Sequence, residues 1–291
     1  MIEDVFLKAA DKAAREEMRA AVLDSGRVSC QTVGKSIMGE SIDLYSIGNG
    51  RGRVIYFGAH HSLESITCNL LFTFMYELIT GKINTHGRDL STLMSLYTYL
   101  IVPCVNPDGI EMRYHGVDAS PIKDRQINMS GGSFDVWQAN ARGVDLNHNY
   151  NAGFLSYKVL EKEKGITPGP TLYSGEYPES EPESRTAANL VRTLSPAAVV
   201  SLHSQGEEIY FSPKTQRVSR IASRLCDTVG YRVAVPNGTA AYGGLCDFSG
   251  NMGIPSFTIE VGKGQNPLSE KSIPEIYSRI SSALLLLPTM L

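Results

Sequence analysis

The sequence predicts an α/β fold: a single domain with a mixed, mostly parallel central sheet that helices flank on both faces. Two observations favour this class. Short apolar runs of strand length alternate with longer segments of helical periodicity along most of the chain. In addition, 42% of the 291 residues are hydrophobic. A chain of this length can bury a sizeable core, on the order of 75% of its unfolded surface.

The distribution of polar residues bears on the number of domains. Length alone would allow about two domains. However, the residues with metal-binding or catalytic chemistry are spread over most of the chain, and they must converge to act together. We therefore expect one domain over residues 1–291. An N-terminal helical extension is expected at about residues 1–25, because Val5 to Leu23 form a polar amphipathic pattern.

The first clear strand and the first clear helix of the core follow each other directly. Residues 53–58 form an apolar run typical of a buried strand, and residues 65–80 repeat apolar side chains with the spacing of one helix face. Gly81 suits a helix C-cap. Further strands are expected near residues 98–104, 197–203, 207–212, 231–235 and 256–261. Further helices are expected near residues 181–194, 214–229 and 272–287.

Three residues are candidate ligands for a zinc ion. His61 and Glu64 lie in the turn between this strand and this helix, and His203 ends the apolar run Ala197–Leu202. Catalytic zinc typically binds three such side chains and keeps one coordination position open. On spacing alone an alternative stays open, because a His-x-x-Glu pair often arises by chance and a histidine after a strand is often only hydrogen bonded.

Five segments, in this order, resemble the signature segments of zinc metallocarboxypeptidases of the carboxypeptidase A type. They are Phe57–Glu64, Val105–Gly109, Arg142–Tyr150, Leu202–Gly206 and Ser256–Glu260. Within this family, the residues from Leu202 to Tyr210 and from Asn147 to Tyr150 are most similar to a bacterial branch. That branch contains γ-D-glutamyl-diaminopimelate peptidases, which cut cell-wall peptides.

The resemblance implies a carboxypeptidase-like fold and a role for four residues. His61, Glu64 and His203 match the ligands of one zinc ion. Glu260 matches the carboxylate that takes a proton from the zinc-bound water and passes it to the leaving amine. This division of labour is chemically sound, because zinc lowers the pKa of bound water toward about 7 and a nearby carboxylate can complete its activation.

One position departs from the pancreatic pattern in a way that bears on the substrate. Asn147 matches the asparagine that helps hold the free carboxylate beyond the cleaved bond, but the arginine expected next to it is replaced by His148. A histidine lacks the permanent charge and the two-pronged donor of arginine. A substrate with differently arranged carboxylates, such as γ-linked diaminopimelate, fits this change. An exposed loop histidine without a function would fit it equally.

A second departure concerns the group that stabilises the oxyanion. The residue after Trp137 is Gln138, where the pancreatic pattern has an arginine. Losing one such donor commonly costs about 2.7–4 kcal/mol of transition-state stabilisation, so another positive group is expected. Arg125 is the candidate, because it lies in an insertion before Trp137 that the cell-wall branch also carries. Arg142 is the second choice, and either could be an ordinary surface arginine.

Two further residues are candidate contacts for the substrate. Tyr242 lies near the mobile tyrosine of the family, shifted by a few residues, and a following glycine pair would let its loop move. It could equally pack against the loop. Cys246 matches the floor of the pocket for the residue after the cleaved bond. An uncharged floor argues against a preference for lysine or arginine side chains.

Composition adds expectations about partners and location. A formal charge of −3, a sequence pI near 6.1 and the lack of a basic cluster give no reason to expect a nucleic-acid partner. The sequence shows neither a bilayer-spanning stretch nor a secretory signal at its start. Five scattered cysteines favour reduced thiols and a cytoplasmic protein. The oligomeric state is not indicated.

Three functions follow as hypotheses. The first is a zinc peptidase that cleaves the γ-D-glutamyl to diaminopimelate bond of small, murein-derived peptides. The second is a conventional metallocarboxypeptidase that releases C-terminal residues, or a related amidase. The third is a non-catalytic zinc-binding module. Glu260 speaks against the third, because a structural zinc site does not need an additional carboxylate beside an open coordination position.

Overall fold

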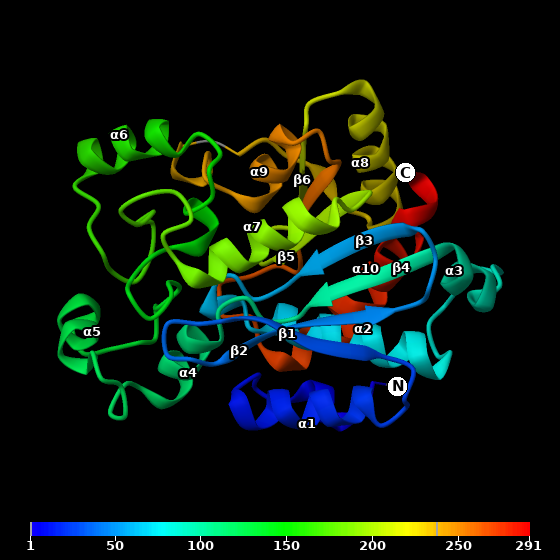
Figure 1. Cartoon of the computed structure of the whole chain (residues 1–291), viewed down its shortest axis with the longest axis horizontal. Coiled ribbons are helices and arrows are strands. Elements are labelled where there is room, and N and C mark those ends of the chain that lie inside the picture. Colours follow the sequence, from blue (N-terminus) through cyan, green and yellow to red (C-terminus); the bar gives the residue numbers. More distant parts are fainter. Residues whose placement is uncertain (1, 237) are drawn as a thin grey trace.

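The central element of the computed structural model is an eight-stranded sheet, formed within the described residues 2–236 and 238–291 (Figure 1). The strand order is β1-β2-β4-β3-β5-β8-β6-β7. The strands are β1 (Ser29–Lys35), β2 (Ser41–Ile47), β3 (Gly52–Phe57), β4 (Tyr97–Val102), β5 (Ala198–His203), β6 (Glu208–Ser212), β7 (Arg232–Val233) and β8 (Ser256–Glu260).

The middle of the sheet is parallel, its flanks join it through antiparallel pairs, and the edge strand β7 pairs parallel with β6. Strands β4, β3, β5 and β8 run in one direction, whereas β1 pairs antiparallel with β2, β2 with β4, and β6 with β8. Every residue of β5 is buried, as expected for a central strand that is covered on both faces. The mixed, mostly parallel sheet predicted from the sequence is confirmed.

Helices cover both faces of the sheet, as predicted. On one face, apolar residues of α1 (Lys12–Leu23), α2 (Ile66–Thr80), α8 (Gln216–Val229) and α10 (Ile273–Leu286) share a core with the strands. On the other face, α7 (Pro182–Leu194) and α9 (Leu245–Asn251) pack on a second apolar cluster. Alternate residues of β3 serve the two cores: Tyr56 faces the first, and Phe57 faces the second.

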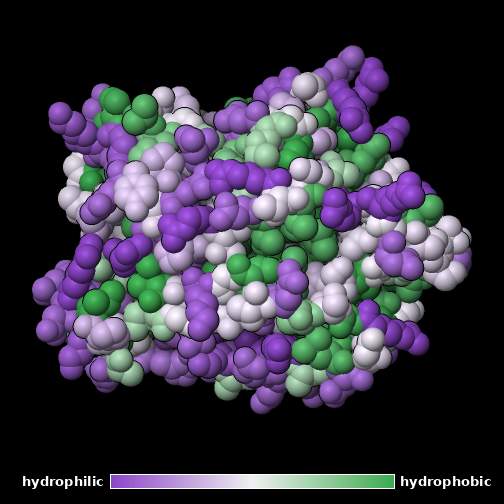
Figure 2. All heavy atoms as spheres, in the orientation of Figure 1, coloured by the Kyte–Doolittle hydropathy of each residue, from purple (hydrophilic) through white to green (hydrophobic). Residues whose placement is uncertain are grey.

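The remaining helices lie in connections. They are α3 (Leu90–Leu96), α4 (Pro107–His115), α5 (Lys123–Ser130) and α6 (Phe154–Lys164). Single 3-10 turns occur at Asp4–Leu7, Ser62–Glu64, Leu146–His148, Gly238–Ala240, Glu270–Ser272 and Leu287–Met290. Among the described residues, no helix combines the length and the apolar character that crossing a membrane requires. In the view of Figure 2, hydrophilic residues cover most of the surface and hydrophobic ones form separate small groups.

Several boundaries differ from the sequence prediction. The helix expected over Val5 to Leu23 is instead a 3-10 turn followed by α1. Helix α1 begins after Asp11, because the Asp11 carboxylate accepts a hydrogen bond from the backbone N–H of Ala14. Met18 and Val22 of α1 are buried in the core that α2 also lines, so this helix packs on the sheet layer. The strand expected at 231–235 shrinks to the two residues of β7. Strands β1 and β2 were not predicted.

A buried polar network joins helix α7 to the loops beside it. The Glu183 side chain accepts hydrogen bonds from the backbone N–H of Ile37 at 3.1 Å and from the Asn140 amide at 3.2 Å. The residue is fully buried. Burial raises the pKa of Glu183 to about 7, and nearby Asp108 and Glu181 add to the rise. This carboxyl therefore favours its neutral form in the folded protein.

We expect Glu183 to make stability fall with increasing pH. Its carboxyl ionises near pH 4.5 in the unfolded chain and near pH 7 in the folded one, so the folded state holds the extra proton in between and loses stability as pH rises through this window. In urea unfolding, Glu183→Gln should gain stability relative to the wild type between pH 4.5 and 7.5, on the order of 3 kcal/mol. A difference in the free energy of unfolding between Glu183→Gln and the wild type that stays constant over this pH range would contradict the prediction. Exposed Glu176→Gln is the control and should follow the wild type.

Candidate active site

The ends of parallel strands bring the candidate metal ligands together. Strands β3 and β5 are parallel neighbours with Phe57 opposite Ser201, so their carboxyl ends lie at the same edge of the sheet. His203 is the last residue of β5, and His61 follows β3 after a short loop. That loop passes so close to the next segment that a Cβ on Gly58 would lie 2.8 Å from the Pro103 carbonyl oxygen, which only glycine permits.

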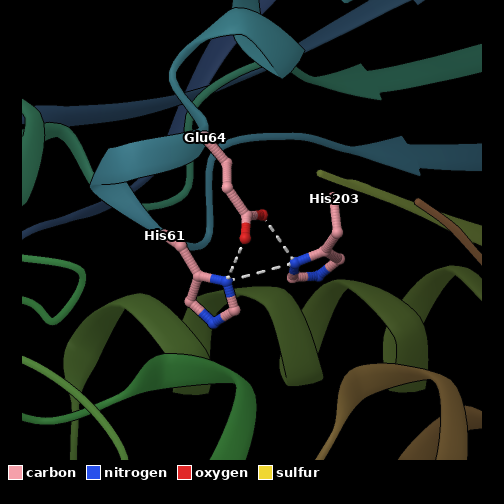
Figure 3. Close-up of side chains that lie close together, drawn as sticks. All are labelled: His61, Glu64 and His203. Carbon is pink, nitrogen blue, oxygen red and sulfur yellow. Dashed lines mark hydrogen bonds and ion pairs between the residues drawn. The ribbon is translucent and has the colours of Figure 1, made fainter. Parts of the chain in front are cut away.

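The three side chains point toward one another, as Figure 3 shows. Glu64 Oε1 lies 3.0 Å from His61 Nδ1, and Glu64 Oε2 lies 2.9 Å from His203 Nδ1. The two Nδ1 atoms are only 3.3 Å apart. All three residues are buried. Burial opposes ionisation of Glu64, but the two imidazoles lower its pKa to about 2, so the carboxylate carries a negative charge.

The donor set and its spacing fit zinc. Two imidazole nitrogens and a carboxylate are common zinc ligands. Ligand atoms about 2.0 Å from a tetrahedral zinc stand roughly 3.3 Å apart, and the two Nδ1 atoms have this separation. Suitable atoms of the three side chains all lie within 4.8 Å of one another. A single ion could therefore contact all three without a large rearrangement of the protein.

Asp145 orients one of the ligands, and the sequence reasoning overlooked it. Its Oδ1 lies 3.1 Å from His61 Nε2, so it would hold the proton on Nε2 and leave the Nδ1 lone pair to a metal when one is bound. The backbone N–H of Leu172 donates to Oδ2 at 3.0 Å. Although burial alone would raise it, the charge of His61 and the hydrogen bonds from His61 and Leu172 hold the pKa of Asp145 well below its usual range. The available signal was its position two residues before Asn147.

The ligands open into a cavity of about 480 Å³. Glu260 lines it and lies opposite His203 in the register of β5 and β8. Burial and the charge of Glu64 raise the pKa of Glu260 well above its usual value. The cavity thus brings the predicted base next to the three predicted metal ligands. Three other predicted contacts also line this cavity: Asn147, His148 and Cys246.

The contacts and the charge of His148 differ from those of an arginine that binds a substrate carboxylate. Its Nδ1 donates to the backbone carbonyl of Tyr242 at 2.9 Å, and its ring stacks on Tyr157 with centroids 4.1 Å apart. Burial lowers the pKa of His148, which favours the neutral ring. With the proton on Nδ1, the other ring nitrogen can only accept a hydrogen bond. Neutral His148 therefore offers no donor to a substrate carboxylate.

Asn147 can fill part of that role. Its Oδ1 accepts a hydrogen bond from the backbone N–H of Leu245 at 3.3 Å. This contact orients the side-chain amide and leaves its NH₂ group for other partners. The residue lines the cavity next to His148.

Arg125 and Tyr242 do not line this cavity. Arg125 is exposed on α5 and lines a separate hollow of about 160 Å³ together with Arg142, which pairs with Glu181 at 2.9 Å. Tyr242 is 47% exposed, and its ring packs against Gly153. The structure therefore gives neither residue the position that the sequence analysis expected.

Two residues that the sequence analysis did not propose as functional line the cavity instead. Gln138 stands where the arginine of the pancreatic pattern is missing, and its amide lies 3.4 Å from Asp145 Oδ2. Lys214, just after β6, contributes a positive charge. Nothing in the spacing of the sequence pointed to Lys214, because it belongs to none of the five segments.

Removing the Asp145 carboxylate should weaken metal binding. Without it, His61 can rotate or carry its proton on Nδ1, and loss of such a partner typically lowers affinity about 10- to 100-fold. We expect this loss for Asp145→Ala in a competition titration of zinc against a chelator. Asp118→Ala, at an exposed carboxylate, should bind zinc like the wild type. Equal affinities for all three proteins would show that Asp145 does not orient a ligand.

Known proteins are similar to this chain in sequence. The zinc carboxypeptidase family model matches residues 16–279. Gamma-D-glutamyl-L-diamino acid endopeptidase 1 of Lysinibacillus sphaericus is 32% identical over 258 residues, which make up 84% of this chain and 63% of that protein. Murein peptide amidase A of Escherichia coli (strain K12) is 28% identical over 137 residues, 41% of this chain and 46% of that protein. The chain thus spans less than two thirds of the length of these two relatives.

A solved structure supports the fold. Bovine thrombin-activatable fibrinolysis inhibitor, in complex with tick carboxypeptidase inhibitor, superposes with a TM-score of 0.74 at 20% identity. The superposition covers 98% of this chain and 97% of that one, which establishes a carboxypeptidase-like fold. Together with the match over residues 16–279, it leads to one conclusion: the chain belongs to the zinc carboxypeptidase family of metallopeptidases.

Proposed function

We propose that the protein hydrolyses the γ-D-glutamyl to diaminopimelate bond of small, murein-derived peptides with one zinc ion. The observation that carries this proposal is the convergence of His61, Glu64 and His203 beside Glu260 at an open cavity. Held by these three side chains, zinc would supply Lewis-acid activation of water and of the scissile carbonyl. The family membership makes the peptidase chemistry the first choice.

The protein's own groups have distinct tasks in this reaction. Glu260, in register with His203, would accept the proton of the attacking water and return it to the leaving amine, a role that suits a carboxyl of raised pKa. Asp145 keeps His61 in the ligating orientation. The Asn147 amide would donate to the substrate beside the cleaved bond.

Two observations support the cell-wall substrate over ordinary C-terminal residues. A relative with 32% identity is named for cleavage between γ-D-glutamate and an L-diamino acid. Moreover, His148 is held neutral with its Nδ1 proton engaged, so neither diaminopimelate nor an ordinary C-terminal residue would gain an ion pair at this position. A substrate with a second carboxylate, such as diaminopimelate, could instead pair with Lys214 elsewhere in the cavity.

We also propose that the protein acts in the cytoplasm. All five cysteines are free thiols in the structure, and this fits the reducing cytoplasm. There, peptides released from the cell wall would be the natural source of the substrate.

A pair of substrates with and without a chelator tests the proposed function. Zinc-loaded protein should release diaminopimelate from L-alanyl-γ-D-glutamyl-diaminopimelate but leave hippuryl-type C-terminal substrates intact. Chelation should abolish the activity, and added zinc should restore it. Turnover of hippuryl substrates alone would overturn the proposal.

Two variants sharpen this experiment. Glu260→Gln should retain zinc but lose at least about 100-fold in kcat, as expected when a general base is removed. Exposed Glu163→Gln is the matched control and should retain activity. Near-normal turnover by Glu260→Gln would assign the base to another residue.

A further inference from the structure

Lys214 and Asp247 add charge to the wall of the cavity away from the metal ligands. Among the described residues that line the cavity, Lys214 is the only lysine or arginine. Its ammonium lies 2.5 Å from the carbonyl oxygen of Phe211 and 4.1 Å from the centroid of the Phe211 ring. These contacts fix its position, and neither of them neutralises its charge.

The register of the sheet gives an approximate distance between the Lys214 ammonium, which lies beside Phe211, and Glu260 at the metal-binding end of the cavity. Strand β6 pairs antiparallel with β8, so that Glu208 faces Glu260 and Phe211 faces Phe257. Three residues of strand therefore separate Glu260 from the level of Phe211, roughly 10 Å at 3.3 Å per residue. Cys246 and Thr258 line the cavity in between. The cavity thus has a metal-binding end and a charged end, with uncharged side chains between them.

Asp247 supplies the opposite charge at the second end. It belongs to the first turn of α9, next to Cys246, and is half-buried. Burial raises the pKa of Asp247, whereas the charge of Lys214 and a hydrogen bond with Ser212 lower it. Lys214 and Asp247 line the same cavity, and no direct ion pair joins them in the described structure.

We propose that Lys214 and Asp247 bind the amino acid group at the far end of the diaminopimelate side chain. Lys214 would pair with its carboxylate and Asp247 with its ammonium. This inference rests on the proposed function and names the part of the substrate that this end of the cavity recognises. Lys214, which forms no ion pair in the described structure, and the half-buried carboxylate of Asp247 lie on one wall of the cavity. Together they complement the two opposite charges of a zwitterion. A substrate group with a single positive charge, or an apolar one, would leave Lys214 without a partner.

The size of the substrate agrees with this assignment. Four carbon–carbon bonds of about 1.5 Å each separate the Cα of diaminopimelate from the carbon that bears the distal amino and carboxylate groups. Together with the scissile amide and the distal carboxylate, this reach is comparable to the roughly 10 Å between Glu260 and the level of Phe211. A lysine residue in the substrate would bring an ammonium toward Lys214 and would lack the carboxylate, so it should be rejected.

Substrate selectivity tests the role of Lys214. The peptides are L-alanyl-γ-D-glutamyl-meso-diaminopimelate and its analogue with L-lysine at the last position. The wild type should prefer the first peptide. Because Lys214 is exposed, we expect Lys214→Gln to lose about 10-fold in kcat/KM on the first peptide, mainly through KM. It should not lose activity on the second. Lys214→Arg should restore part of the preference. An equal loss on both peptides, or no loss, would overturn the proposal.

A third peptide, ending in 2-aminopimelate, tests Asp247. It keeps the distal carboxylate and lacks the distal amine. The wild type should favour diaminopimelate over this analogue, and Asp247→Asn should remove that preference. Retention of the preference in Asp247→Asn would exclude the carboxylate as the partner of the ammonium.

Direct binding separates this inference from the proposed function. In calorimetry, zinc-loaded wild type should bind free meso-diaminopimelate more tightly than L-lysine, and Lys214→Gln should lose this difference. If the wild type cleaves neither peptide yet binds meso-diaminopimelate through Lys214, the subsite stands and the proposed reaction falls. If meso-diaminopimelate binds no better than L-lysine, the subsite is overturned.

Discussion

The close approach of two imidazole nitrogens is the constraint on which the rest of the site depends. His61 Nδ1 and His203 Nδ1 lie 3.3 Å apart in a buried position, with Glu64 against both. Two lone pairs or two protons at that distance repel each other, whereas a cation between them turns the repulsion into attraction. The fold must therefore hold these side chains in place, and the parallel register of β3 and β5 does so.

The same constraint explains the distribution of charge in the cavity. Glu64, Asp145 and Glu260 place three carboxyl groups at the metal-binding end of the cavity, and His148 is held neutral. A divalent ion would offset this negative potential at one end of the cavity. At the other end, Lys214 is the only lysine or arginine among the described lining residues. A substrate carboxylate would therefore meet a lysine only at the end of the cavity away from the metal ligands.

The sequence predicted the parts of the structure that depend on local pattern. The apolar run at β3, the helix α2 after it and the strand ends at His203 and Glu260 were all recognisable, because buried central strands are apolar throughout and active-site residues follow their ends. Strand β1 was not predicted, because most of its residues are polar and at least partly exposed. As an edge strand, it is stabilised by pairing with β2, which no periodicity reveals.

The residues that were misplaced or missed depend on contacts between distant segments. Arg125 was chosen because it lies near Trp137 in the sequence, but Trp137 is buried whereas α5 carries Arg125 on its exposed side. Asp145 acts on His61 across 84 positions of the chain. Lys214 reaches the cavity only because β6 pairs with β8, which carries Glu260. Such relations arise from topology, and the sequence alone does not encode them in any short pattern.

Anomalous X-ray scattering from crystals of the zinc-loaded protein tests the central claim most directly. We predict one strong peak at the zinc absorption edge, about 2.0–2.2 Å from His61 Nδ1, from His203 Nδ1 and from a Glu64 oxygen, with an open side toward Glu260. A peak bound through other atoms, or no peak between these three side chains at saturating zinc, would contradict the account.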